Sequence, residues 1–180
     1  EYIRQTTGQF DSRRFVMTYP NEQLPAGRPL KMAPAHDAMR MAGCQWGQSW
    51  DLEVPLYFAP EGFSEIPSLK RSNAFDIVGA ECRSVRAGVG LLDITGFSRF
   101  EVTGPNAEAW LNSIMASKLP KPGRAALAPM LSPEGRMKGD LSLFNWGDGS
   151  WWIMGSYYLR AWHMRWFNDY LTDGVVVREL

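Results

Sequence analysis

Apolar and polar residues follow clear periods in the second part of the chain. Apolar residues at three- and four-residue steps predict an amphipathic helix over residues 78–89, which ends at two glycines. Alternation over residues 98–103 predicts a half-buried strand. A Gly-Pro pair at 104–105 then opens a second helix, because proline at the first helical turn loses no hydrogen bond. The apolar stripe of this helix consists of Ala107, Trp110, Leu111, Ile114 and Met115.

The rest of this part reads as strands with one further helix. A hairpin is predicted from arms at 125–131 and 136–145, because the four residues between them, Ser-Pro-Glu-Gly, have turn chemistry. The remaining predicted elements are a strand at 151–155, a helix at 159–171 and a strand that begins at 175–177. This order of elements predicts an α+β fold with a largely antiparallel sheet and flanking helices.

The first seventy residues have a different composition. Seven of the twelve prolines lie there, and each fixes φ and removes a backbone donor. These prolines are Pro20, Pro25, Pro29, Pro34, Pro55, Pro60 and Pro67. We therefore expect residues 1–70 to form a Pro-rich, extended or turn-rich linker with few long helices and one short helix at 34–43. A separate domain is expected over residues 71–180.

Composition and charge narrow the class of protein. Hydrophobic residues make up 45% of the chain, which is typical of a globular protein. The 19 basic and 19 acidic residues balance to a net charge of zero without a basic block, which disfavours a nucleic-acid partner. No apolar run approaches membrane-spanning length, so no membrane partner is expected.

Cysteines and histidines are few and isolated. Cys44 and Cys82 form no metal-binding or redox motif, and we interpret them as reduced, partly buried thiols. That interpretation favours the cytoplasm, or the mitochondrial matrix if the protein is eukaryotic. His36 and His163 are the two histidines, and they form no metal-ligand cluster with the cysteines. His163 lies on the predicted aromatic helix, where we interpret it as a core or boundary residue.

One carboxylate, Asp140, stands out in the return strand of the predicted hairpin. Alternation places Lys138, Asp140 and Ser142 together on the less apolar face. The Lys138 ammonium would favour an ionised carboxylate, and Gly139 would let a backbone or a flat ligand approach closely. The residues alone leave two interpretations open: Asp140 grips a basic, nitrogen-rich ligand, or it is a solvated surface residue.

Two long runs carry a family resemblance. They are GAECRSVRAGVGLLDITGFSRFEVTGPNAEAWLN and MLSPEGRMKGDLSLF, and they resemble the tetrahydrofolate-binding half of the dimethylglycine and sarcosine dehydrogenases. The same module resembles the T-protein (aminomethyltransferase) of the glycine cleavage system. Two earlier runs, GQFDSRRF and RPLKMAPAHDAMRMAGCQWGQSW, are similar to the linker between the flavin and folate domains of those flavoproteins. Together the matches cover most of residues 8–172.

The resemblance implies a two-part enzyme. In such an enzyme a flavin domain with FAD oxidises an N-methyl amine, and a folate domain captures the one-carbon unit on tetrahydrofolate. Asp140 occupies the aspartate position of the family's G-G-x-x-x-D pattern, where this chain reads EGRMKGD. The resemblance therefore implies that Asp140 orients the folate and assists proton transfer, and that Met130, Gly139 and Gly155 also belong to the folate-binding site.

At two places the chain departs from the T-protein pattern, and these departures indicate which branch of the family it resembles more. Small residues at 125–128 and at Gly155-Ser156 replace the tyrosine and asparagine that T-proteins usually carry, which favours the flavin-linked relatives. By this resemblance the flavin domain and the second half of the folate domain lie outside the chain, so the chain alone is expected to be inactive. Two alternatives stay open: a flavin-independent, tetrahydrofolate-dependent aminomethyltransferase or demethylase, and a non-catalytic binding module with the same fold.

Overall fold

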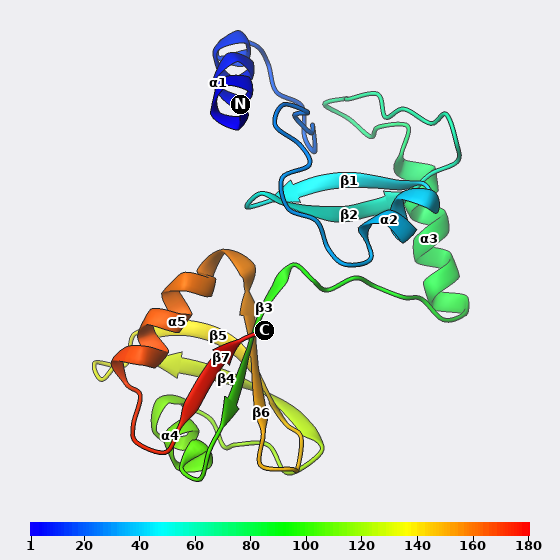
Figure 1. Cartoon of the computed structure of the whole chain (residues 1–180). Coiled ribbons are helices and arrows are strands. Elements are labelled where there is room, and N and C mark those ends of the chain that lie inside the picture. Colours follow the sequence, from blue (N-terminus) through cyan, green and yellow to red (C-terminus); the bar gives the residue numbers. More distant parts are fainter. The chain divides into compact units, whose positions relative to one another are not determined.

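The computed structural model describes residues 1–180 as two compact units (Figure 1). Unit 1 comprises Glu1–Thr95 and unit 2 comprises Gly96–Leu180. The division predicted near residue 70 falls earlier in the chain than this boundary. The difference arises because helix α3 (Phe75–Ala87) packs against strand β2 (Leu52–Phe58) and so belongs to the first unit.

Unit 1 is built around an antiparallel hairpin of β1 (Cys44–Ser49) and β2. Trp50 and Asp51 join the strands with φ angles of 50° and 70°, which is the geometry of a type I′ turn. Helix α2 (His36–Met41) lies where the short helix was predicted. Helix α1 (Tyr2–Arg13) was not predicted, and it forms in the stretch before the first proline, Pro20.

A small core joins α3 to the hairpin. Tyr57, Ala59 and Ala74 are buried there, and Phe63 and Ile77 pack against them. The face of α3 that packs on the hairpin therefore includes Ala74 and Ile77, at the start of the helix. It differs from the apolar stripe that the sequence predicted over residues 78–89.

The predicted stripe of α3 faces outward. Val78 is 37% exposed, and the Cys82 thiol is exposed rather than partly buried. Ile77 and Glu81 face the hairpin instead, where the Glu81 carboxylate accepts a hydrogen bond of 2.7 Å from the Phe58 backbone N–H. Because this contact satisfies a backbone donor of β2, it fixes the side of α3 that meets the strand.

Unit 2 contains a five-stranded sheet in the order β4-β5-β6-β3-β7, and all of its strand pairs are antiparallel. The strands are β3 (Phe97–Thr103), β4 (Arg124–Leu131), β5 (Met137–Asn145), β6 (Trp151–Ser156) and β7 (Val176–Glu179). The helices are α4 (Ala107–Ile114), α5 (Arg160–Asp169) and the short 3₁₀ helix η1 (Tyr157–Leu159). An antiparallel sheet with flanking helices confirms the predicted α+β fold class.

The core of unit 2 lies between the sheet and its two α-helices (Figure 1). Phe100 of β3 contacts Phe167 of α5 edge to face, with ring centroids 5.1 Å apart, and Trp110 of α4 contacts the same Phe167 ring at 5.9 Å. The strands contribute alternate residues to this core, as the sequence patterns of β3 and β5 predicted. Both helices therefore cover one face of the sheet, and no helix of unit 2 covers the other.

A β-bulge interrupts the hairpin of β4 and β5 just before Asp140. Met130 pairs with Gly139 and Leu131 pairs with Met137, which leaves Lys138 as the extra residue of β5. The Lys138 ammonium lies 5.4 Å and 4.9 Å from the ring centroids of Trp162 and Trp166 on α5.

The bulge corrects one prediction about Asp140. Strict alternation placed the Lys138 ammonium beside the Asp140 carboxylate, but the two form no ion pair, and the ammonium lies against aromatic rings of α5. A bulge shifts the side-chain alternation by one residue at the point where it occurs, and the sequence pattern did not show where that point was.

Candidate functional site

Asp140 lies on the face of the unit 2 sheet that no helix of the unit covers. It is exposed on β5, and Pro129 of β4 pairs with it directly. The Asp140 carboxylate forms no hydrogen bond or ion pair within the chain. An ionised carboxylate offers only acceptor positions, so this one is free to receive N–H or O–H donors from a ligand.

Cross-strand neighbours of Asp140 make this face a platform of apolar and aromatic side chains. We call it the open face, and it consists of Arg99, Glu101, Ala125, Leu127, Pro129, Asp140, Ser142, Phe144, Trp152 and Met154. Leu127 is 73% exposed, and Trp152 meets Trp146 edge to face at 5.1 Å between centroids. The other carboxylate on this face, Glu101, pairs with Arg178 at 2.9 Å, so Asp140 offers the unpaired one. Apolar and aromatic side chains beside an unpaired carboxylate suit a planar heterocycle that presents N–H groups.

The other three predicted folate-site residues lie on the helix-covered side of the same strands. Met130 is fully buried in the core, and Gly139 and Gly155 are buried under α5. The structure therefore brings Met130, Gly139 and Gly155 together, but the direction in which a side chain would leave each position is opposite to that of Asp140.

His163 of α5 occupies the space above the two glycines. A Cβ atom added to Gly139 would lie 3.1 Å from His163 Nε2, and one added to Gly155 would lie 3.2 Å from His163 Cε1. Gly139 was expected to let a flat ligand approach closely. On this side of the strand the His163 ring occupies that space. His163 is 1% exposed, which agrees with its interpretation as a core residue.

Sequence reasoning did not connect His163 to the Asp140 strand. The sequence did contain a signal for this contact, namely Gly139 and Gly155 among the larger residues of β5 and β6. A glycine inside a strand often marks the close approach of another group. Burial lowers the pKa of the His163 imidazole, and an interaction with the Lys138 backbone opposes part of that effect.

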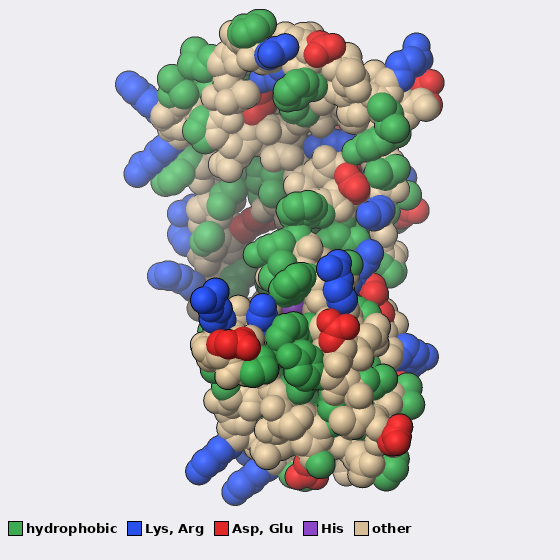
Figure 2. Space-filling model, turned by 90° about the vertical axis from the view of Figure 1, so that its left-hand side faces the viewer, with side chains coloured by type: hydrophobic (Ala, Val, Ile, Leu, Met, Phe, Trp, Pro, Cys, Tyr) green, Lys and Arg blue, Asp and Glu red, His purple; other side chains and the backbone are tan.

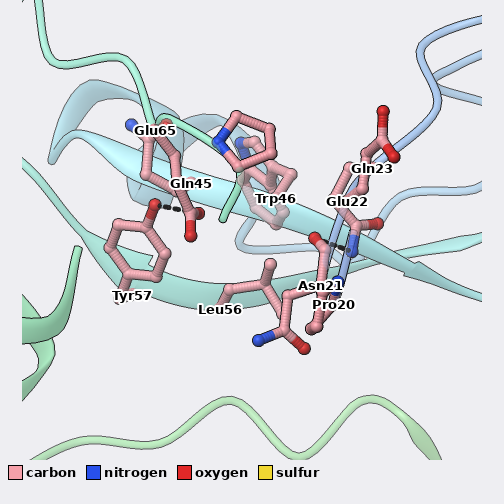
Figure 3. A pocket seen from close by; sticks show the side chains of 10 residues that line it. Pro20, Asn21, Glu22, Gln23, Gln45, Trp46, Leu56, Tyr57 and Glu65 are labelled. Atoms are coloured by element: carbon pink, nitrogen blue, oxygen red, sulfur yellow. Dashed lines mark hydrogen bonds between the residues drawn. The ribbon is translucent and has the colours of Figure 1, made fainter. Parts of the chain in front are cut away.

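A hollow lies in unit 1, apart from the Asp140 face, with a volume of about 270 Å³ (Figure 3). The Tyr57 hydroxyl donates to the Glu65 carboxylate at 2.7 Å, and Ser72 donates to the same carboxylate at 2.6 Å. Burial, and next the hydrogen bond to Glu65, raise the pKa of Tyr57. No histidine or cysteine lines the hollow.

Other classes of site are not formed. No group of three or more histidine, cysteine, aspartate or glutamate side chains is arranged to hold a metal ion. None of the helices has the length and apolar content that crossing a bilayer requires. Acidic and basic side chains are interspersed on the face that Figure 2 shows.

Comparisons with known proteins place the sheet and its helices in a known family. Residues 35–180 match the GCVT N-terminal domain. Mitochondrial dimethylglycine dehydrogenase of Rattus norvegicus is 27% identical over 161 residues, a match that covers 88% of this chain and 19% of the rat protein. The mitochondrial pyruvate dehydrogenase phosphatase regulatory subunit of Mus musculus is 26% identical over 166 residues, with 87% of this chain and 19% of that protein covered.

A solved structure shares the fold. The glycine cleavage system aminomethyltransferase T from Bartonella henselae aligns with a TM-score of 0.66 at 20% identity, over 84% of this chain and 38% of that one. The chain thus spans about a fifth of the length of the rat and mouse relatives and less than half of the solved aminomethyltransferase.

Proposed function

Because this chain belongs to the GCVT N-terminal domain family, we propose that it binds tetrahydrofolate for an FAD-dependent N-methyl amine dehydrogenase of the dimethylglycine or sarcosine type. The observation that carries the proposal is the exposed, unpaired Asp140 carboxylate on the open face of the sheet. The similarity to dimethylglycine dehydrogenase over 88% of the chain supports this assignment.

The open face fits a reduced pterin. The Asp140 carboxylate accepts hydrogen bonds from ring or amino N–H groups, and Phe144 and Trp152 offer apolar ring surface on neighbouring strands. Tetrahydrofolate, when bound, supplies the nitrogen that takes up a one-carbon unit. In this proposal Asp140 orients that nitrogen and accepts its proton at a carboxylate oxygen, as a general base does. In this proposal Gly139 and Gly155 act from the helix-covered side of the sheet, where they allow α5 to pack closely on β5 and β6.

The residues of this chain do not fit FAD. Dinucleotides bind at parallel βαβ units with a glycine-rich loop, whereas both sheets here are antiparallel and the sequence contains no G-x-G-x-x-G motif. We therefore assign flavin chemistry and amine oxidation to a flavin domain of the full-length protein. We assign the remaining folate contacts to the second half of its folate domain.

Calorimetry on the full-length protein tests the proposal. Tetrahydrofolate is titrated into the wild-type protein, into Asp140→Ala, and into Asp169→Asn as a control that removes an exposed carboxylate at the end of α5. The proposal requires binding by the wild type and the control and much weaker binding by Asp140→Ala. Equal binding by all three proteins would remove Asp140 from the site.

A regulatory, non-catalytic module is the second candidate, and the similarity to a phosphatase regulatory subunit favours it. The flavin spectrum of the purified full-length protein separates the candidates. A bound flavin together with tetrahydrofolate binding supports the dehydrogenase, and tetrahydrofolate binding without flavin supports a T-protein-like aminomethyltransferase or demethylase. Absence of both ligands supports the module. Both named relatives are mitochondrial, and we keep the mitochondrial matrix as the expected location in a eukaryote and the cytoplasm otherwise.

A further inference from the structure

His163 is a buried polar side chain whose hydrogen-bonding capacity is not met. It is 1% exposed, and neither Nδ1 nor Nε2 has a hydrogen-bond partner of ordinary geometry. An apolar side chain at this position would avoid the cost of burying an unsatisfied donor. A histidine kept in such a place calls for an explanation beyond packing.

The imidazole is held in a defined position by the core around it. The Phe100 ring meets it edge to face at 6.5 Å and the Phe167 ring lies at 6.3 Å. Gly139 and Gly155 form the floor, with ring atoms 3.1–3.3 Å from where their Cβ atoms would lie. Packed interiors have little free volume, so a shift of the imidazole ring would also shift the backbone at Gly139 and Gly155.

Those two glycines directly precede the polar residues of the other face. Gly139 precedes Asp140, and Gly155 precedes Ser156. Successive side chains of a strand point to opposite faces, so His163 contacts the covered side of the strand pair whose next residues face outward. Nε2 is the His163 atom nearest to the position of a Gly139 Cβ, one residue beyond the bulge at Lys138.

The surroundings favour an uncharged imidazole. Phe167 faces it from α5, Phe100 from β3 and Gly155 from β6, and none of these carries charge. From β5 two ionisable residues flank Gly139 in sequence. The Lys138 ammonium lies against Trp rings of α5, and the Asp140 carboxylate lies on the opposite face of the strand. Burial among these uncharged groups disfavours a positive charge on the imidazole.

We propose that His163 is a positioning residue for Asp140: its uncharged imidazole, set against Gly139 and Gly155, holds the β5 bulge in the shape that aims the Asp140 carboxylate across the open face. This inference rests on the proposed folate site. It gives the unsatisfied ring nitrogen a role, because the bulge disrupts the strand ladder at Lys138 and leaves backbone groups that the imidazole N–H faces.

A consequence is that protonation of His163 weakens the Asp140 site. An imidazolium at this position is enclosed by uncharged side chains and strand backbone, so in this proposal it moves away from Gly139 and Gly155, and the bulge loses its support. The folate affinity of the wild-type protein should therefore depend on pH through His163 between pH 7.5 and pH 5.0.

Three variants of the full-length protein test the proposal. His163→Phe keeps a ring against the glycines and removes the nitrogens, whereas His163→Gln keeps a polar N–H without titrating. His36→Phe is the matched control, because His36 is the other histidine and stacks on Trp46 in unit 1. Tetrahydrofolate dissociation constants are measured for each protein at pH 7.5 and pH 5.0.

The expected results differ between the variants. At pH 7.5 His163→Phe binds about fivefold more weakly than wild type, because it loses the polar interaction of the imidazole with the Lys138 backbone at the bulge, and His163→Gln recovers wild-type affinity. Between pH 7.5 and pH 5.0 the wild type and His36→Phe weaken by at least about threefold more than His163→Gln. The proposal is overturned if His163→Phe binds within about twofold of wild type, if His163→Gln fails to recover affinity, or if it keeps the wild-type pH profile.

A second readout does not require folate binding. The carboxyl ¹³C resonance of Asp140 should follow the titration of His163 in the wild-type protein and not in His163→Gln. If the wild type fails to bind tetrahydrofolate, the proposed function fails, and this resonance still decides whether His163 positions Asp140. An Asp140 resonance that ignores the His163 titration would contradict the positioning role.

Discussion

The Nε2 atom of His163 lies 3.1 Å from the point where a side chain at Gly139 would begin. Alanine at 139 would also approach Leu141 Cγ to 3.0 Å, so both neighbours would have to move. We expect Gly139→Ala to lower the free energy of unfolding of unit 2 by about 1–3 kcal/mol, the usual cost of overpacking a core. Urea unfolding followed by circular dichroism measures this change.

The cause of that loss can be checked with two controls. Gly8→Ala lies in α1 with nothing within 4 Å of its new Cβ, so we expect a stability gain of about 0.5–1 kcal/mol. Combining Gly139→Ala with His163→Ala should cost less than the sum of the two single changes, because the second substitution vacates the space. Strict additivity would show that the imidazole is not what Gly139→Ala meets.

The pH dependence of stability should carry the signature of His163. Burial lowers the pKa of this group in the folded state, so below the unfolded pKa of about 6.5 the unfolded chain binds more protons. The stability is therefore fully present above that pH and falls as pH decreases through it. The slope of the unfolding free energy between pH 7.5 and pH 5.0 should flatten in His163→Phe, and a slope equal to that of the wild type would show that another group causes the pH dependence.

The protein should lose stability at alkaline pH because of Tyr57. Its pKa is raised in the folded state, so the folded protein holds the phenolic proton after the unfolded chain has lost it near pH 10. The contribution of Tyr57 is present below that pH and declines above it. Tyr57→Phe should remove the decline between pH 9.5 and pH 11, and an unaltered alkaline slope would show that another group is responsible.

A buried ion pair should dominate the charge contribution in unit 1. The Arg28 Nε atom donates to Glu53 at 2.8 Å, with their side chains 12% and 4% exposed. We expect Arg28→Met to destabilise the protein by about 3–5 kcal/mol, because it leaves the Glu53 carboxylate buried and unpaired. Arg4→Met removes the arginine of a solvent-exposed pair with Glu1 and should leave the stability nearly unchanged.

The sequence predicted the sheet of unit 2 well because its signal is local. Alternation identified Phe100 and Val102 as inward residues, and turn chemistry located the hairpin before Asp140. The position of Lys138 was missed because a bulge changes the alternation without changing the composition of the strand. The partner of Gly139 was missed because His163 is distant in sequence and is brought there only by packing.

The first part of the chain was harder to predict for a related reason. Proline content indicated turns, yet it says nothing of residues before Pro20, where α1 forms. Val78 of α3 faces solvent because the hydrogen bond between Glu81 and the Phe58 N–H of β2 orients the helix. Such long-range polar contacts override the apolar period of a helix whose buried area is small.

The most direct measurement of the central claim is the tetrahydrofolate dissociation constant of the isosteric variant Asp140→Asn in the full-length protein. The substitution keeps the shape of the side chain and removes its charge and one of its acceptor positions. The account predicts that Asp140→Asn binds about 10–100-fold more weakly than wild type at pH 7.5, as expected for the loss of a hydrogen bond to a charged group, while Asp169→Asn binds as wild type does. An affinity within about twofold of wild type would contradict the account and leave Asp140 a solvated residue of the sheet.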